Sequence, residues 1–173
     1  MLIVAATERE LAQVRRFETF CCGVGPVEAA IRTATALADR EPDGVIHVGI
    51  AGARAIEPLS LVIGSEAVYE DAAGPLIPSR LEPDAALLES LRRALPEALV
   101  LPIGTSARVG GASSCEIEAM EGFGVLRACA LAGVPAVELR VVSNSPDESD
   151  RTKWRFEEAF GLLGAALDRL DVL

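Results

Sequence analysis

Short apolar runs alternate with helix-like patterns along the whole chain. Residues 2–6 form a short continuous apolar run, which is typical of a strand buried on both faces, and the mostly apolar residues 44–48 and 136–142 are also expected to be strands. Between such runs, apolar residues recur with a helical period, most clearly over residues 27–40, 84–95 and 151–170. This alternation predicts one α/β domain that spans residues 1–173 and has a largely parallel sheet covered by helices on both sides.

Weaker patterns complete the predicted fold. We expect further strands at residues 17–22, 61–69, 76–77, 98–103 and 105–109, and further helices at residues 8–16 and 118–132. The predicted fold class is therefore an α/β three-layer sandwich, with a mostly parallel mixed central sheet flanked by helices. In such folds, ligands bind in the crevice beyond the carboxyl ends of the strands.

Small and polar residues gather just past the predicted strand ends. They are Glu8 and Glu10, Gly23 and Gly25, the segment from Gly49 to Gly52, and Ser143 with Asn144. The Gly23-Val24-Gly25 turn lacks both the third glycine of a dinucleotide motif and the lysine of a P-loop. It is read either as a tight turn or as a place where backbone N–H groups approach an anion.

Three glutamates are candidates for chemistry. Glu10 follows the first predicted strand, while Glu118 and Glu121 lie three apart at the expected start of a helix. Acidic residues at that point also complement the helix dipole, so a purely structural role stays open. A carboxylate pair nevertheless suits a hydroxyl-rich ligand, because one carboxylate accepts from a sugar diol and the other orients and deprotonates water.

Arg140 stands near the end of an apolar strand, where an unpaired guanidinium would be costly. We expect it to pair with Asp147, Asp150 or one of the glutamates named above. A purely structural salt bridge is as good an explanation of Arg140 as a role in ligand binding. Asn144 follows this strand and offers both a donor and an acceptor. That combination can recognise the N7/O6 edge of a 6-oxopurine.

Neither the four cysteines nor the single histidine suggests a metal site. Cys21 and Cys22 are adjacent, Cys115 and Cys129 stand alone, and no CxxC spacing occurs. His47 lies inside a predicted strand, which favours a core or supporting role over catalysis. We expect no metal and no organic cofactor.

The formal net charge of −10 narrows the choice of partners. An acidic surface repels phosphate backbones and anionic lipids, so we expect no nucleic acid and no membrane partner. No apolar stretch approaches the roughly 18 residues that span a bilayer. The first ten residues lack a basic region and do not resemble a signal peptide, so we expect a cytoplasmic protein.

Five segments, in order, resemble the nucleoside phosphorylase/nucleosidase superfamily. They are residues 5–11 (AATEREL), 22–30 (CGVGPVEAA), 48–53 (VGIAGA), 117–122 (IEAMEG) and 140–144 (RVVSN), followed by Trp154. The form Glu-x-Met-Glu-Gly, the Ser-Asn pair and the Arg151-x-x-Trp154 segment most resemble the futalosine hydrolases. That resemblance implies a nucleoside phosphorylase-like fold and release of hypoxanthine from futalosine, a reaction of menaquinone biosynthesis.

The resemblance also implies roles for single residues. Glu10 would activate the attacking water, Met120 would pack on the ribose, and Glu121 would bind the ribose 2′- and 3′-hydroxyls. Gly52, Arg140, Ser143 and Asn144 match substrate-binding segments, the last three beside N7 of the purine. In adenine-releasing relatives the position of Asn144 is held by an aspartate, and this aspartate protonates N7. Asn144 cannot supply a proton, so it favours hypoxanthine, although Asp147 or Asp150 keeps adenine release open.

Several alternatives remain at this stage. Phosphorylases of the superfamily have Arg and Ser at the positions of His47 and Ile50, so water is the expected nucleophile here. Residues 109–113 lack the base-stacking aromatic of the relatives, and Phe123 or a neighbouring subunit would have to replace it. An adenine-releasing nucleosidase, a phosphorylase, or a nucleoside-binding protein without catalysis are therefore alternatives. The resemblance further implies a homo-oligomer.

Overall fold

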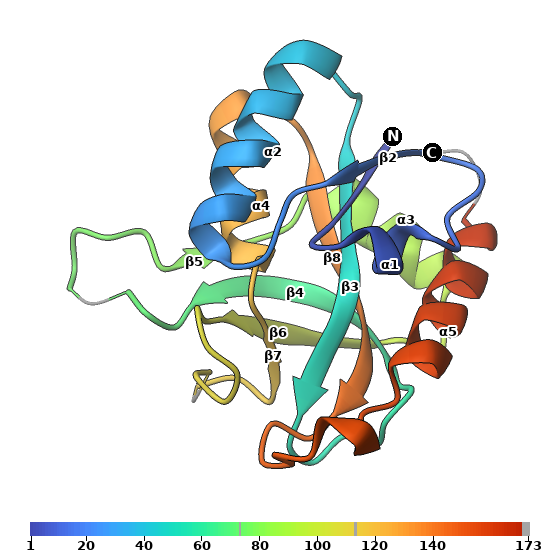
Figure 1. Ribbon diagram of the computed structural model, residues 1–173. Helices are drawn as coiled ribbons and strands as arrows, with labels where there is room; N and C mark the ends of the chain where they lie inside the picture. Colours follow the sequence, from blue (N-terminus) through green and yellow to red (C-terminus); the bar gives the residue numbers. More distant parts are fainter. Residues whose placement is uncertain (73, 113, 171–173) are drawn as a thin grey trace.

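The computed structural model describes residues 1–72, 74–112 and 114–170 (Figure 1). The strands are β1 (Leu2–Ala5), β2 (Glu18–Cys21), β3 (Val45–Ala53), β4 (Leu61–Tyr69), β5 (Arg80–Leu81), β6 (Leu99–Thr105), β7 (Ile117–Ala119) and β8 (Ala136–Asn144). The helices are α1 (Glu8–Leu11), α2 (Pro26–Arg40), α3 (Ala85–Ala94), α4 (Gly122–Ala132) and α5 (Phe156–Asp168), with a 3-10 turn at Arg151–Lys153. Strands alternate with helices except where β3, β4 and β5, and then β6 and β7, follow one another without a helix between them.

The sheet is mixed and closes on itself. Strands β2, β1, β3 and β8 are parallel neighbours, and β8 then pairs antiparallel with β4. From β4 the path runs through β6 and β7 back to the end of β3. The mixed sheet with flanking helices agrees with the prediction. The flat middle layer of a three-layer sandwich does not, because β3, β8, β4, β6 and β7 form a closed ring.

The ring forms because the two halves of the long strand β3 have different neighbours. Residues 45–47 pair with β1, whereas Gly52 and Ala53 pair with β7. The other side of β3 is paired with β8 along almost its whole length. The interior of the ring is filled by small and branched apolar residues, among them Ala51, Ile103 and Ile117.

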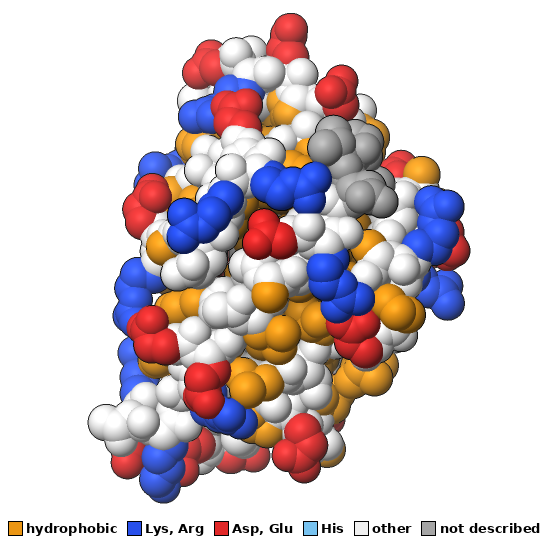
Figure 2. All heavy atoms as spheres, turned by 90° about the vertical axis from the view of Figure 1, so that its right-hand side faces the viewer, with side chains coloured by type: hydrophobic (Ala, Val, Ile, Leu, Met, Phe, Trp, Pro, Cys, Tyr) orange, Lys and Arg blue, Asp and Glu red, His pale blue; other side chains and the backbone are white. Residues whose placement is uncertain are grey.

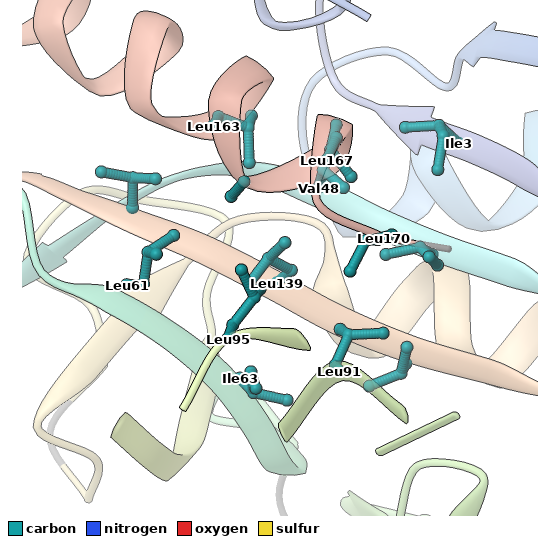
Figure 3. Packing of buried hydrophobic residues seen from close by; sticks show 14 of the residues in the cluster. Ile3, Val48, Leu61, Ile63, Leu91, Leu95, Leu139, Leu163, Leu167 and Leu170 are labelled. Atoms are coloured by element: carbon teal, nitrogen blue, oxygen red, sulfur yellow. The ribbon is translucent and has the colours of Figure 1, made fainter. Parts of the chain in front are cut away.

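Two helical layers cover the outer faces of the sheet. Helices α2 and α4 lie against one face, where they bury residues such as Leu37 and Val125. Helices α3 and α5 cover the opposite face together with α1. Leu163 and Leu167 of α5 pack there towards Leu139 of β8 and the α3 residue Leu91 (Figure 3). Each fully buried aliphatic side chain stabilises the fold by about 1.5–3 kcal/mol.

Several element boundaries differ from the sequence prediction. Residues 76–77 and 106–109 are not in strands, Thr105 is the last residue of β6, and a short strand forms at 80–81. The first helix ends at Leu11, and the last one begins only at Phe156, after the 3-10 turn. Glu118 was expected in a helix but lies in β7, because it pairs with both β3 and β6. The helix starts four residues later, at Gly122.

The surface around α1 and α5 carries both signs of charge. Figure 2 shows this face, where acidic and basic side chains are interspersed around exposed hydrophobic ones. Among the described residues, no helix is both long and apolar enough to cross a bilayer.

Candidate active site

A pocket of about 250 Å³ opens beyond the carboxyl ends of β1, β3 and β8. Its walls come from the first helix turn, from the ends of β3 and β8, from the segment 118–121, and from α5. The lining residues that carry the arguments below are Glu10, Gly52, Glu118, Met120, Glu121 and Asn144. Five of the seven residues predicted to bind or act on substrate therefore share one pocket, while Arg140 and Ser143 lie behind its wall.

Glu10 is held in place by the start of its own helix. Thr7 is the N-cap of α1 and forms a capping box, in which its backbone N–H donates to Glu10 Oε2 at 2.9 Å and its hydroxyl at 2.8 Å. The other oxygen, Oε1, accepts from the backbone N–H of Ile50 at 3.2 Å. The side chain is buried at the pocket wall, so both oxygens have fixed positions.

Glu121 lines the same pocket as Glu10. Its Oε1 accepts from the backbone N–H of Gly25 at 3.0 Å, and its Oε2 lies 3.9 Å from Arg140 Nη2. Gly25 has a φ of 92°, a conformation that glycine adopts most readily. The Gly23-Val24-Gly25 turn thus does bring a backbone N–H to an anion, and that anion is a side chain of the protein. Burial raises the pKa of Glu121, although Arg140 and the Gly25 N–H oppose the shift.

Arg140 is 1% exposed and joins the buried charges. Its Nε donates to Glu138 Oε1 at 2.7 Å, its Nη1 donates to the Ile50 carbonyl at 3.4 Å, and its Nη2 contacts His47. The partners are therefore Glu138 and Glu121, and neither Asp147 nor Asp150 pairs with Arg140 in the described structure. Burial raises the pKa of Glu138, and the neighbouring Arg140 opposes that shift.

His47 supports this cluster as a neutral ring. Its Nδ1 lies 3.0 Å from the Val4 carbonyl, so Nδ1 carries the hydrogen and Nε2 accepts from Arg140. Burial, reinforced by the charge of Arg140, lowers the pKa of His47 well below its usual value. With all three carboxylates ionised, the cluster of Glu10, Glu121, Glu138, Arg140 and His47 carries an excess of negative charge.

Glu138 is a member of this cluster that the sequence analysis did not single out. It lies two residues before Arg140 in β8, and side chains at that spacing point to the same face of a strand. Its Oε2 has no hydrogen-bond partner within the described residues. A Cβ on Gly122 would lie 2.2 Å from this oxygen, so only glycine fits after Glu121. The Glu-x-Arg spacing was the available signal.

Asn144 presents its amide beside Gly52. The Ser143 hydroxyl donates to Asn144 Oδ1 at 2.8 Å, which leaves the amide NH₂ available to a ligand. A Cβ on Gly52 would lie 3.3 Å from Asn144 Nδ2 and 2.9 Å from a carbon of Pro146. Pro146 and Asn144 therefore leave no room for a side chain at residue 52.

The far end of the pocket is aromatic. Trp154, Phe156 and Phe160 line it, with the Arg9 guanidinium 5.3 Å from the centre of the Phe160 ring and 6.0 Å from that of Phe156. Phe123, which was expected to replace the missing base-stacking aromatic, stacks on Tyr69 at 5.1 Å and does not line the pocket. Val109 is the pocket-lining residue of the segment 109–113, in which Ser113 lies outside the described residues.

No group of three or more side chains suited to hold a metal ion occurs among the residues that the structure describes. The pocket and the residues behind its wall supply carboxylates, one guanidinium, one amide and backbone groups. Such a set can bind a polyhydroxylated ligand, hold a water beside a carboxylate, and stabilise positive charge that develops between the two.

Comparison with known proteins identifies the family of the chain. Residues 15–119 match the Phosphorylase superfamily. A futalosine hydrolase from Streptomyces coelicolor is 35% identical, with 89% of this chain and 78% of that protein aligned. The corresponding enzyme from Acidothermus cellulolyticus is also 35% identical, over 83% of this chain and 73% of the relative.

Solved structures show the same fold at lower identity. A futalosine hydrolase mutant from Helicobacter pylori superposes with a TM-score of 0.87 at 17% identity, covering 98% of this chain and 96% of the other. A Neisseria meningitidis 5′-methylthioadenosine/S-adenosylhomocysteine nucleosidase, in complex with methylthio-immucillin-A, gives 0.81 at 21% identity, covering 98% and 95%. With its nucleoside phosphorylase-like α/β fold, the chain belongs to the futalosine hydrolase family of the phosphorylase superfamily.

Proposed function

We propose that this protein hydrolyses the N-glycosidic bond of futalosine, or of a closely similar 6-oxopurine nucleoside, and releases hypoxanthine. The observation that carries the proposal is the meeting of Glu10 and Glu121 in one pocket with Met120 and Asn144. The family supports it, since the relatives from Streptomyces and Acidothermus are futalosine hydrolases. The protein acts as a cytoplasmic nucleosidase in this proposal.

In the proposed mechanism Glu10 activates the water. One lone pair on Oε1 is used by the Ile50 N–H, and the remaining one is free to accept a water proton. The water oxygen bonds to C1′ of the ribose, the bond from C1′ to the purine N9 breaks, and its electron pair leaves with the base. Glu10 takes the proton that the water loses. This proton then passes from Glu10 to the leaving base.

Glu121 and the rest of the buried charges stabilise the ribose as it becomes cationic. Glu121 Oε2 is not hydrogen-bonded within the described residues except for its distant contact with Arg140, so it can accept from the ribose hydroxyls. The excess negative charge of the cluster favours an oxocarbenium-like transition state. Met120 packs on the sugar from the pocket wall.

Asn144 stabilises the leaving base in this proposal. Because Ser143 occupies its Oδ1, the amide donates its N–H to N7 or O6 of the purine, where negative charge develops. Ser143 acts through Asn144, and Arg140 acts through Glu121, so both are positioning residues in the proposal. The sequence prediction gave Arg140 and Ser143 direct contacts with the substrate, but neither side chain lines the pocket.

Water rather than phosphate is the nucleophile we favour. Ile50 lines the pocket with an apolar side chain, and the guanidinium of Arg140 is already engaged by Glu138, His47 and the Ile50 carbonyl. A phosphate would therefore find few free donors at the position where relatives that use it have Arg and Ser.

The test is a product assay with futalosine, inosine and methylthioadenosine, each with and without phosphate. Release of hypoxanthine from futalosine without phosphate is the expected result. Strict phosphate dependence would instead assign a phosphorylase, and faster release of adenine would assign a methylthioadenosine-type nucleosidase. Nucleoside binding without release of any base would assign a binding protein.

We further propose that residues 1–173 form one domain and that it assembles into a homo-oligomer. Val24, Val27 and Ile31 are each more than half exposed on the outer face at the start of α2, and Val24 also lines the pocket. A second copy covering these side chains would shield the pocket mouth. A single cooperative unfolding transition tests the first statement, and analytical ultracentrifugation tests the second.

A further inference from the structure

Glu118 is a pocket-lining carboxylate that the proposed reaction does not use. Its side chain is only 6% exposed. Oε1 accepts from the backbone N–H of Gly110 at 2.6 Å, which ties the short loop after β6 to the pocket wall. Oε2 is buried and has no hydrogen-bond partner in the described structure, and Arg54 Nη2 lies 3.5 Å away. A buried carboxylate oxygen without a hydrogen-bond donor is costly unless a ligand supplies one.

The strand register places Glu118 and Asn144 on either side of Gly52. Gly52 pairs with Glu118 across β3 and β7, and with Asn144 across β3 and β8. A Cβ on Gly52 would lie 3.3 Å both from Glu118 Cγ and from Asn144 Nδ2. Neighbouring strands are about 4.8 Å apart, so the backbones of the two residues are separated by about twice that distance. Both side chains also line the pocket, so a flat heterocycle bound there would contact the two of them at once.

The two side chains offer complementary hydrogen-bonding groups. Asn144 offers an amide donor, because Ser143 occupies its oxygen, whereas Glu118 offers only an acceptor. A 6-oxopurine has acceptors at N7 and O6 and a donor at the adjacent N1–H. Adenine has a lone pair at N1 and no hydrogen there. Its N1 and the carboxylate oxygen would both be acceptors, so they could not form a hydrogen bond.

We infer that Glu118 is a specificity-determining residue that accepts the N1–H of a 6-oxopurine while Asn144 donates to its N7/O6 edge. The inference rests on the proposed nucleoside hydrolysis and adds how the base is selected. Glu118 thus distinguishes the lactam form of hypoxanthine from adenine at a position that Asn144 does not reach. Arg54 balances the charge of Glu118 from its outer side.

The first experiment compares two nucleosides that differ only at the base: futalosine, and the same molecule with adenine in place of hypoxanthine. The Glu118→Gln variant can still accept from the Gly110 N–H through its amide oxygen, but it then presents an NH₂ to N1. We expect kcat/KM for futalosine to fall about 10- to 100-fold, the effect of losing a hydrogen bond to a charged group. The adenine compound should lose less or gain.

The matched control is Arg54→Met. This substitution removes the ion pair but keeps the acceptor, so the ratio of kcat/KM between the two nucleosides should stay near that of the parent protein. An equal loss for both nucleosides in Glu118→Gln would overturn the inference, because it would reduce Glu118 to an anchor for the loop at Gly110. A change of ratio in Arg54→Met as large as in Glu118→Gln would overturn it too.

A second experiment needs no variant and no catalysis. Titration calorimetry of the unaltered protein with hypoxanthine, 1-methylhypoxanthine and adenine measures base binding directly. Hypoxanthine should bind about 10-fold or more tightly than 1-methylhypoxanthine, which keeps O6 and N7 but has no N1–H. Equal binding of the two overturns the inference even if the protein hydrolyses futalosine. Selective binding of hypoxanthine without hydrolysis of any nucleoside overturns the proposed function and leaves base recognition standing.

Discussion

The two ends of the pocket differ in how far the protein satisfies its own polar groups. Near β1, both oxygens of Glu10 and all three nitrogens of Arg140 have partners within the chain. Near β7, Oε2 of Glu118 and the amide nitrogen of Asn144 have no hydrogen bond to any described residue. A polar group that its neighbours hold in place is suited to catalysis, because its position is fixed. A polar group without a hydrogen bond is available to recognise a ligand.

The largest effect should come from Glu10, at the end of the pocket near β1. Glu10→Gln keeps the size of the side chain but loses the base, so kcat for futalosine hydrolysis should fall by about 10²- to 10⁴-fold. Glu8→Gln, an exposed change in the same helix turn, is the control and should keep the parent rate. Steady-state release of hypoxanthine measures both. A Glu10→Gln protein that folds and keeps the parent rate would contradict the role of Glu10.

Arg140→Met should reveal the structural cost of the same cluster. The substitution leaves the buried Glu138 and Glu121 carboxylates without their cation, and breaking a buried pair costs about 3–5 kcal/mol of unfolding free energy. Urea unfolding measures it. Arg155→Met removes an exposed pair with Glu158 and should leave the urea midpoint nearly unchanged. Equal midpoints for the two variants would show that burial of the cluster does not matter.

The pH profile should report Glu121. Burial favours its neutral form and raises its pKa above the ordinary 4.5, while the reaction needs the ionised form to accept from the ribose hydroxyls. We therefore expect kcat/KM to fall as the pH drops through a value above 4.5, by about tenfold per pH unit on the acid limb.

The same shift has the opposite sign for stability. The folded protein holds the Glu121 proton more tightly than the unfolded chain does, so this contribution is present below pH 4.5 and is lost as the pH rises through the raised pKa. An acid limb of kcat/KM at or below pH 4.5, with the protein still folded, would contradict the role given to Glu121.

The smallest effect should come from the aromatic side chains Trp154, Phe156 and Phe160, which lie outside the two regions compared above. Trp154→Ala removes one wall of the pocket and its ring contact with Phe156. Because an aromatic contact contributes about 0.5–1.5 kcal/mol, KM for a nucleoside with a bulky 5′ group should rise about 2- to 10-fold. Inosine, which has only a hydroxyl there, should show a smaller change. A larger loss for inosine would move the 5′ group to another part of the pocket.

Much of this site could be predicted because its residues follow strand ends. Glu10, Gly52 and Asn144 come just after or at the end of apolar runs that pair as parallel neighbours, and the topology alone brings such positions together. Glu121 was a candidate from its spacing to Glu118, whereas Met120 was named only from the resemblance. Both line the pocket, and their roles stay proposals.

The remaining features depend on tertiary contacts that a local pattern does not contain. A three-residue strand such as β7 is too short for its period to be distinguished from the first turn of a helix, so Glu118 was placed in a helix. The expected partners of Arg140 included Glu121, which does pair with it, but not Glu138, which lies two residues earlier on the same strand face. The closed ring likewise depends on β3 exchanging β1 for β7 as its neighbour.

The pairing of β7 with β3 consists of just two residue pairs, Gly52 with Glu118 and Ala53 with Ile117. A slip by one residue would turn Glu118 to the opposite face of the strand, since side chains alternate along it. Mutations in the segments that connect β7 to its neighbours would therefore switch the preferred nucleobase without replacing any amino acid that touches it. Laboratory evolution towards new bases should accordingly randomise these connecting segments as well as the cavity walls.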